Sequence, residues 1–156
     1  MLDEARQRTQ TLQSRMREQS IELAIFTDES SIAYLAGFWG YLGVEFGRPS
    51  MLLVPADATP TIITPLMETE MVSAMTWVES IISWEDSGQR SWHRLLGAEI
   101  RKHLGETSEA IWIERQNIPA LVRNYLDESF SGAALSDISP VLGAMRMIKS
   151  PLEIEI

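Results

Sequence analysis

The stretch Leu23-Ala24-Ile25-Phe26 decides the fold, because it places four apolar residues in a row near the start of the chain. A short continuous apolar run is typical of a strand that is buried on both faces. Residues 2–16 before it carry apolar side chains at helical spacing among charged ones, which predicts an amphipathic helix. Residues 28–36 after it begin with Asp and Ser caps and stop before Gly37, which predicts a second, shorter helix.

Two further apolar runs predict a hairpin. Met51–Val54 and Thr61–Ile63 are joined across Pro55-Ala56-Asp57, residues that are typical of a turn. Strand-like runs that lie this close together pair in the antiparallel sense. The predicted sheet therefore contains at least one antiparallel pair.

The rest of the chain alternates between helical and strand patterns. Thr64-Pro65 has the proline of a first helical turn, which predicts a helix whose apolar face carries Met67, Met71, Ala74 and Met75. Further strands are predicted near residues 80–83, 110–113 and 133–135, and further helices near residues 92–104, 121–126 and 139–145. Strands separated by helices form parallel pairs, so the predicted fold class is α/β, with a mixed sheet and flanking helices.

The predicted core consists of the apolar side chains that these strands and their covering helices share. The strand residues are Leu23, Ile25, Leu53, Ile63, Ile82 and Ile113, and the helix residues are Leu96, Ile100, Leu121 and Leu126. A chain of 156 residues is long enough to bury such a core as one domain.

The composition argues against several classes of function. With 22 acidic and 13 basic residues the net charge is −9, and an acidic surface repels a phosphate backbone, so we expect no nucleic-acid partner. There is no cysteine, hence no disulfide framework and no thiolate metal site. The first residues lack an apolar signal region, and no run approaches the ~20 apolar residues of a membrane span. We expect a cytoplasmic protein that has no membrane partner.

The candidate catalytic groups do not combine into a site. His93 and His103 lie ten residues apart on one predicted helix, which is about 15 Å along its axis and too far to bind one metal together. No G-x-S-x-G elbow surrounds a serine. Neighbouring acidic residues are expected on solvated faces, namely Glu68 and Glu70, Glu85 and Asp86, and Asp127 and Glu128. We therefore predict no catalytic residue and no metal ligand in this chain.

The segment from Gly37 to Pro49, Gly-Phe-Trp-Gly-Tyr-Leu-Gly-Val-Glu-Phe-Gly-Arg-Pro, is the candidate functional segment. It is a predicted loop that holds four aromatic residues and one arginine. Its glycines do not match G-x-G-x-x-G, which argues against a nucleotide site. Two interpretations stay open. The rings cover the edge of the sheet, as packing residues do, or the loop presents a ring and a guanidinium to a carboxylate-bearing ligand or a partner subunit.

Several motifs, in order along the chain, resemble the N-terminal domain of the creatinase/prolidase family, the "pita-bread" group that includes Xaa-Pro dipeptidase, aminopeptidase P and creatinase. In the first of them, Ser31 stands where the family often has asparagine. The second is similar to creatinase in particular. The motifs are Ser31-Ile32-Ala33-Tyr34-Leu35-Ala36-Gly37-Phe38, Phe46-Gly47-Arg48-Pro49, Ala110-Ile111-Trp112-Ile113-Glu114, and Met145-Arg146-Met147-Ile148-Lys149-Ser150 with Glu153-Ile154.

The resemblance implies a ribonuclease H-like domain that helps to form a homodimer and reaches over the neighbouring active site. It implies substrate-binding roles for Phe46 and Arg48, which match the Phe and Arg that contact substrate in creatinase-like members. The peptidases of the family use two divalent ions (Mn, Co or Zn), whereas creatinase uses none. The family's metal ligands lie in its catalytic domain and have no counterpart in this sequence, so we expect no cofactor in this chain.

The C-terminal residues Ser150-Pro151-Leu152-Glu153 form a capping box with proline at the first helical position, which predicts the start of a helix. The six residues from Pro151 to Ile156 would give a helix only about 9 Å long, which is marginal by itself. We expect residues 1–149 to form an N-terminal domain and residues 150–156 to begin a linker helix to a C-terminal catalytic domain outside this sequence.

Three functions stay open at this point. The first is a substrate-gating and dimerisation domain of a C–N bond hydrolase of the Xaa-Pro dipeptidase or aminopeptidase type, which acts on small peptides. The second is the same domain of a creatinase-like, metal-independent amidinohydrolase. The third is a stand-alone interaction domain without an enzyme. Under each of them this chain alone is expected to be inactive.

Overall fold

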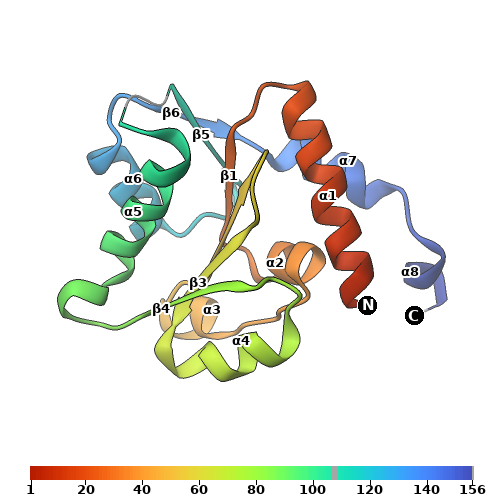
Figure 1. Ribbon diagram of the computed structural model, residues 1–156, viewed down its shortest axis with the longest axis horizontal. Coiled ribbons are helices and arrows are strands. Elements are labelled where there is room, and N and C mark those ends of the chain that lie inside the picture. Colours follow the sequence, from red (N-terminus) through yellow and green to blue (C-terminus); the bar gives the residue numbers. More distant parts are fainter. Residues whose placement is uncertain (107–108, 156) are drawn as a thin grey trace.

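The structure, a computed structural model, describes residues 1–106 and 109–155 (Figure 1). No helix within these ranges is both long enough and apolar enough to cross a membrane. The elements in chain order are α1 (Leu2–Glu18), β1 (Leu23–Phe26), α2 (Glu29–Ala36), α3 (Leu42–Phe46), β2 (Met51–Pro55), β3 (Thr61–Pro65), the 3-10 helix η1 (Leu66–Glu68), α4 (Thr69–Met75), β4 (Ser80–Trp84), the 3-10 helix η2 (Gly88–Arg90), α5 (Trp92–Leu104), β5 (Ala110–Ile113), α6 (Ala120–Ser129), β6 (Ala134–Asp137), α7 (Ser139–Met147) and α8 (Pro151–Glu155).

A six-stranded sheet runs through the molecule in the order β4-β3-β2-β1-β5-β6. Strand β2 is antiparallel to both of its neighbours, β1 and β3. The pairs β3–β4, β1–β5 and β5–β6 are parallel. Ile25, in the middle of β1, lies beside Leu53 of β2 and Ile113 of β5. The predicted mixed α/β fold and its antiparallel hairpin are confirmed.

Helices cover both faces of the sheet and divide the core into two halves (Figure 1). Helices α1, α2 and α7 pack on one face, through a cluster that includes Leu12, Ile32 and Leu142. Helices α5 and α6 pack on the other face, through a cluster that includes Leu96 and Leu126. All four residues of β1 are buried, because this strand lies between the two helical layers. This position explains its continuous apolar sequence.

The helix caps that the sequence predicts are present. Asp28 caps α2, because its Oδ2 accepts a hydrogen bond from the backbone N–H of Ser31 at 3.1 Å. At α8 the capping box is formed in both directions: Ser150 N donates to Glu153 Oε2 at 2.9 Å, and Glu153 N donates to Ser150 Oγ at 3.2 Å. These ends are therefore determined by local sequence.

The structure corrects the prediction that Thr64-Pro65 starts a helix. Both residues belong to β3, where Thr64 pairs with Ser83 and Pro65 with Trp84. The parallel pairing with β4 extends the strand to the proline, and a 3-10 turn separates it from α4. In consequence Val72 is the buried residue of α4, whereas Met67 is exposed.

Two core residues were also predicted wrongly. Leu121 is 40% exposed, because α6 turns Val122 and Leu126 toward the sheet instead. Ile82 is only partly buried, since β4 is an edge strand and one of its sides lacks a neighbouring strand. The other predicted core residues, Leu23, Ile25, Leu53, Ile63, Leu96, Ile100, Ile113 and Leu126, are buried. The segment Gly37–Pro49, predicted as a loop, contains the short helix α3.

Candidate functional site

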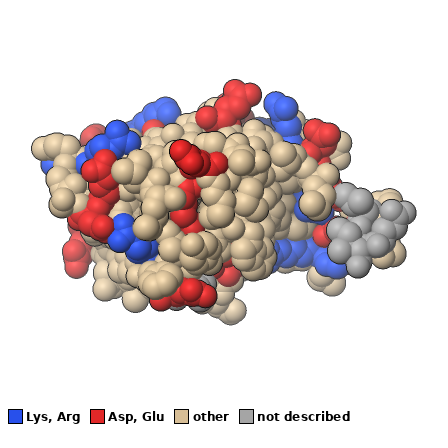
Figure 2. Space-filling view, turned by 90° about the horizontal axis from the view of Figure 1, so that it is seen from below, with Lys and Arg blue, Asp and Glu red and all other residues tan. Residues whose placement is uncertain are grey.

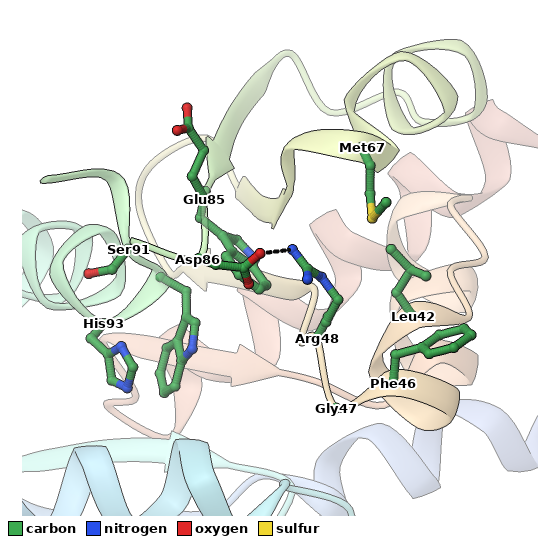
Figure 3. A pocket seen from close by; sticks show the side chains of 11 residues that line it. Leu42, Phe46, Gly47, Arg48, Met67, Glu85, Asp86, Ser91 and His93 are labelled. Carbon is green, nitrogen blue, oxygen red and sulfur yellow. Dashed lines mark hydrogen bonds and ion pairs between the residues drawn. The ribbon is translucent and has the colours of Figure 1, made fainter. Parts of the chain in front are cut away.

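A cavity of about 610 Å³ lies at the end of the molecule where α3, the end of β4 and the start of α5 meet (Figure 3). A volume of this size suits a small organic ligand. One wall is apolar and comes from α3 and η1, and the opposite wall carries the rings at the start of α5. The lining residues are Leu42, Phe46, Gly47, Arg48, Met67, Trp84, Glu85, Asp86, Ser91, Trp92 and His93.

The backbone around Arg48 is held in place on both sides. Helix α3 ends at Gly47, whose φ of 63° lies in the left-handed region that favours glycine. The backbone N–H of Arg48 then donates to Leu42 O at 3.1 Å and closes the turn. On the other side the buried indole of Trp84 donates from Nε1 to Pro49 O at 3.0 Å. Arg48 therefore enters the cavity from a fixed backbone.

The guanidinium of Arg48 contacts Asp86 and Trp84 in the cavity. Its Nη2 donates to Asp86 Oδ2 at 2.8 Å, and its Cζ lies 5.2 Å from the ring centroid of Trp84, within cation–π range. The Arg48 side chain is 30% exposed and that of Asp86 is 69% exposed. The Nε of Arg48 is buried and has no hydrogen-bond partner among the described residues.

The structure brings the two residues with a predicted substrate role into the same cavity. Phe46 is 64% exposed and stands on α3, on the apolar wall beside Leu42, while Arg48 points toward the β4 side (Figure 3). Sequence reasoning missed Trp84 and Asp86. Both residues follow directly after a predicted strand, which was the available indication. Only the tertiary structure shows that this end of the strand lies beside Arg48.

The acidic neighbours differ from the expectation that all of them are solvated. Glu68 is buried, and its Oε2 accepts from Ser50 Oγ at 3.0 Å and from Thr64 Oγ1 at 3.3 Å. Ser50 lies just after the Arg48-Pro49 dipeptide, so these bonds attach the segment to β3. Asp86 is exposed as predicted, yet its carboxylate is engaged by Arg48 rather than by water alone.

The two histidines lie on α5, as predicted, and only one of them reaches the cavity. His93 is exposed and stacks on Trp92, with ring centroids 3.6 Å apart. Desolvation lowers its pKa, so the imidazole is neutral at neutral pH. His103 is half-buried, and its Nε2 lies 3.7 Å from Glu99 Oε2. Within residues 1–106 and 109–155, no three His, Cys, Asp or Glu residues are grouped so that they could hold a metal ion.

The face around the cavity carries several exposed apolar side chains. Figure 2, which views the molecule from this end, shows a broad area with few charged side chains between charged margins. Exposed large apolar residues lie on the loop before α3, on α3, on η1 and on α4, namely Trp39, Tyr41, Phe46, Leu66, Met67 and Met75, and of these Phe46 and Met67 line the cavity. Exposed apolar surface beside a cavity is a candidate interaction site.

A second polar cluster lies at the carboxyl ends of β1 and β5. Ser31 Oγ donates to Glu114 Oε1 at 2.7 Å, and Arg146 Nη2 donates to Ser31 Oγ at 3.3 Å. Burial raises the pKa of Glu114 to about 7, with the nearby carboxylate of Asp28 adding to the shift, while the Ser31 hydrogen bond and Arg146 act against it. The cluster links β5, α2 and α7.

A mixed sheet with helices on both faces and a ligand-sized cavity at one end define the class, an α/β domain with a candidate binding cavity. The chain belongs to the creatinase/prolidase N-terminal domain family, because the sequence profile of that family matches residues 8–148. The family that the motifs resemble is thereby confirmed. No significant match to a curated protein was found.

Solved structures with the same fold include a proline dipeptidase from Streptococcus pneumoniae, with a TM-score of 0.76 and 21% identity over 90% of this chain and 98% of that chain. A prolidase from Thermococcus sibiricus has a TM-score of 0.80 and 24% identity over 95% of this chain, which spans 38% of that chain. An X-Pro aminopeptidase from Thermotoga maritima has a TM-score of 0.75 and 19% identity over 94% of this chain, again 38% of that chain. These likenesses define the fold.

Proposed function

We propose that this chain is the substrate-gating and dimerisation domain of a C–N bond hydrolase that acts on Xaa-Pro peptides. The observation that carries the proposal is the Arg48 guanidinium, held at the cavity between the Trp84 ring and the wall that bears Phe46. A guanidinium is the side chain suited to bidentate recognition of a carboxylate, and a ring can form the wall of a small substrate pocket. Relatives described as proline dipeptidase, prolidase and X-Pro aminopeptidase support the substrate class.

The exposed apolar face supports the dimerisation role. Phe46 and Met67 of this face line the cavity, so a second subunit that packs there would bring its own surface against Arg48 and Phe46. Under this proposal the cavity is one part of a site, and the neighbouring subunit supplies the rest. The cytoplasmic location and the homodimer belong to the same proposal.

The reacting groups of such an enzyme would come from outside this chain. The described residues do not fit a pair of divalent ions, since they hold no cluster of three ligands. We therefore assign no metal-dependent step to this domain. Its own residues would bind and orient the substrate carboxylate and close the pocket.

The creatinase-like alternative shares this geometry. The Phe46-Gly47-Arg48-Pro49 segment is the observation that favours it, because creatine also carries a carboxylate that a guanidinium can bind. Assays of one full-length preparation on Xaa-Pro dipeptides and on creatine, with and without Mn²⁺, would separate the two functions.

The roles of Arg48 and Phe46 are tested by kinetics on that full-length protein. We expect Arg48→Ala to reduce kcat/KM by a factor that corresponds to a loss of about 1.5–3 kcal/mol of transition-state stabilisation, the range for hydrogen bonds to charged groups. Arg48→Lys should recover only part of the loss, because a point charge cannot reproduce the planar fork. Phe46→Ala should weaken kcat/KM by loosening the pocket wall.

The control is Arg123→Ala, which removes an exposed arginine on α6 that pairs with Asp127. Melting temperatures are measured on the same samples. A lowered melting temperature with unchanged kcat/KM in Arg48→Ala would show that the segment only packs, and would contradict the proposed function.

A further inference from the structure

We propose that Asp86 competes with the carboxylate of a ligand for the guanidinium of Arg48. Asp86 holds the guanidinium in the cavity and is displaced when the ligand carboxylate binds. This inference rests on the proposed function and adds a role for Asp86, to which the proposed function assigns none. Asp86 is thus a positioning residue for Arg48, and it sets how tightly the cavity retains a carboxylate.

The two partners of this ion pair are held unequally. Arg48 emerges from a backbone attached by Trp84 and by the turn after α3, and it lies over the Trp84 ring. Asp86 follows the end of the edge strand β4, and its side chain is 69% exposed. Exposed ion pairs contribute a factor of only about 1.4 to 5 to an equilibrium constant. The aspartate can therefore leave at small cost while the arginine stays.

The arginine also has unused capacity that suits a carboxylate. Only Nη2 bonds to Asp86, at 2.8 Å, and the buried Nε has no partner among the described residues. Nε and Nη2 form one edge of the guanidinium, and a carboxylate with two oxygens can accept from both. A bidentate ligand would satisfy a buried donor that Asp86 leaves unsatisfied, which favours the exchange.

The two carboxylates on this side of the cavity have different partners. Glu85 and Asp86 lie on the same wall, and Glu85 faces Arg90, with 3.7 Å between its Oε1 and Arg90 Nε. Of these two carboxylates, it is Asp86 that forms the ion pair with Arg48. Removing the charge of Asp86 therefore frees the guanidinium, whereas removing the charge of Glu85 only lowers the local negative potential.

The test is a calorimetric titration of this chain with glycyl-proline and with glycyl-prolinamide, which lacks the carboxylate. We expect Asp86→Asn to lower the dissociation constant for glycyl-proline about two- to fivefold. The dissociation constant for glycyl-prolinamide should not change. Asp86→Glu should restore the wild-type value, since it restores a competing carboxylate. Asp127→Asn, which removes the same charge from an exposed ion pair on α6, is the matched control and should change nothing.

The outcomes separate this inference from the function beneath it. If Arg48→Ala abolishes binding while Asp86→Asn binds like the wild type, Arg48 recognises the carboxylate but Asp86 does not compete. Equal gains in Glu85→Gln and Asp86→Asn would also overturn the inference, as an effect of general charge. Binding that Arg48→Ala leaves intact contradicts the proposed function as well. Absence of binding in Asp86→Asn overturns the inference alone, and the kinetic test then decides the function.

Discussion

Glu114 places a carboxyl group that is 3% exposed at the end of β5, where its Oε2 has no hydrogen-bond partner among the described residues. Burial raises its pKa to about 7, against an ordinary value of 4.5. Between these values the folded protein keeps a proton that the unfolded chain has lost. The stability contributed by the protonated form is therefore complete below pH 4.5 and is lost as the pH rises to about 7.

We expect Glu114→Gln to remove this pH dependence. The amide keeps the shape of the carboxyl group but does not ionise, so the variant should gain up to about 3 kcal/mol relative to the wild type between pH 4.5 and pH 8. Urea unfolding of both proteins at the two pH values measures the difference. Glu128→Gln, at an exposed position on α6, is the control. An equal effect of Glu114→Gln at both pH values would show that folding does not raise the pKa of Glu114.

At the same scale, the sequence pointed to Arg48 and Phe46 but not to their surroundings. Both residues belong to one short motif, so a local comparison finds them. Asp86 is 38 residues away from Arg48 in the chain, and only the folding of β4 beside β3 brings it to the guanidinium. Pairs of this kind leave no trace in local sequence.

At the scale of elements, the contact between α5 and α6 depends on a missing side chain. A Cβ built on Gly97, in the middle of α5, would overlap the hydroxyl of Tyr125 on α6 and would lie 3.0 Å from Arg101 Nη1. A glycine inside a helix costs stability, so its presence at this position is explained by the close approach of the Tyr125 ring.

We expect Gly97→Ala to lower the free energy of unfolding by about 1–3 kcal/mol, the cost of overpacking. The matched change is Gly143→Ala on α7, where a Cβ would have nothing within 4 Å. At position 143 the alanine restricts the backbone of the unfolded chain, which should raise the free energy of unfolding by about 0.4–1 kcal/mol. Thermal or urea unfolding compares the two variants. Equal stabilisation by both changes would contradict the close contact between Gly97 of α5 and Tyr125 of α6.

The helix ends follow local sequence more closely than the helix faces do. The caps at Asp28 and Ser150 were predicted and are formed. By contrast, Leu121 of α6 was predicted in the core in place of Val122, although Leu126 was predicted correctly, because Leu121 and Val122 are both apolar and only the packing against the sheet chooses between them. Likewise, Pro65 suits a helix start or a strand end, and the pairing with β4 selects the strand.

At the scale of the whole molecule, stability depends on the central strand β1. Ile25 is 1% exposed and joins the cluster beneath α5 and α6, between Leu53 and Ile113 on the neighbouring strands. We expect Ile25→Ala to lower the free energy of unfolding by about 2–5 kcal/mol. Ile154→Ala, at a 73% exposed position on α8, should cost far less. An unchanged denaturation midpoint for Ile25→Ala would contradict the central place of β1.

The sequence by itself determined the fold class, the order of the elements, most of the core and the family. These properties depend on periodicity, on caps and on motifs, which act over a few neighbouring residues. The tertiary structure decided which strand borders which, and therefore that Trp84 and Asp86 meet Arg48 and that Glu114 is buried beside Ser31. The physical reason is that burial and the pairing of distant charges arise only when the sheet assembles, and no local pattern encodes the strand order.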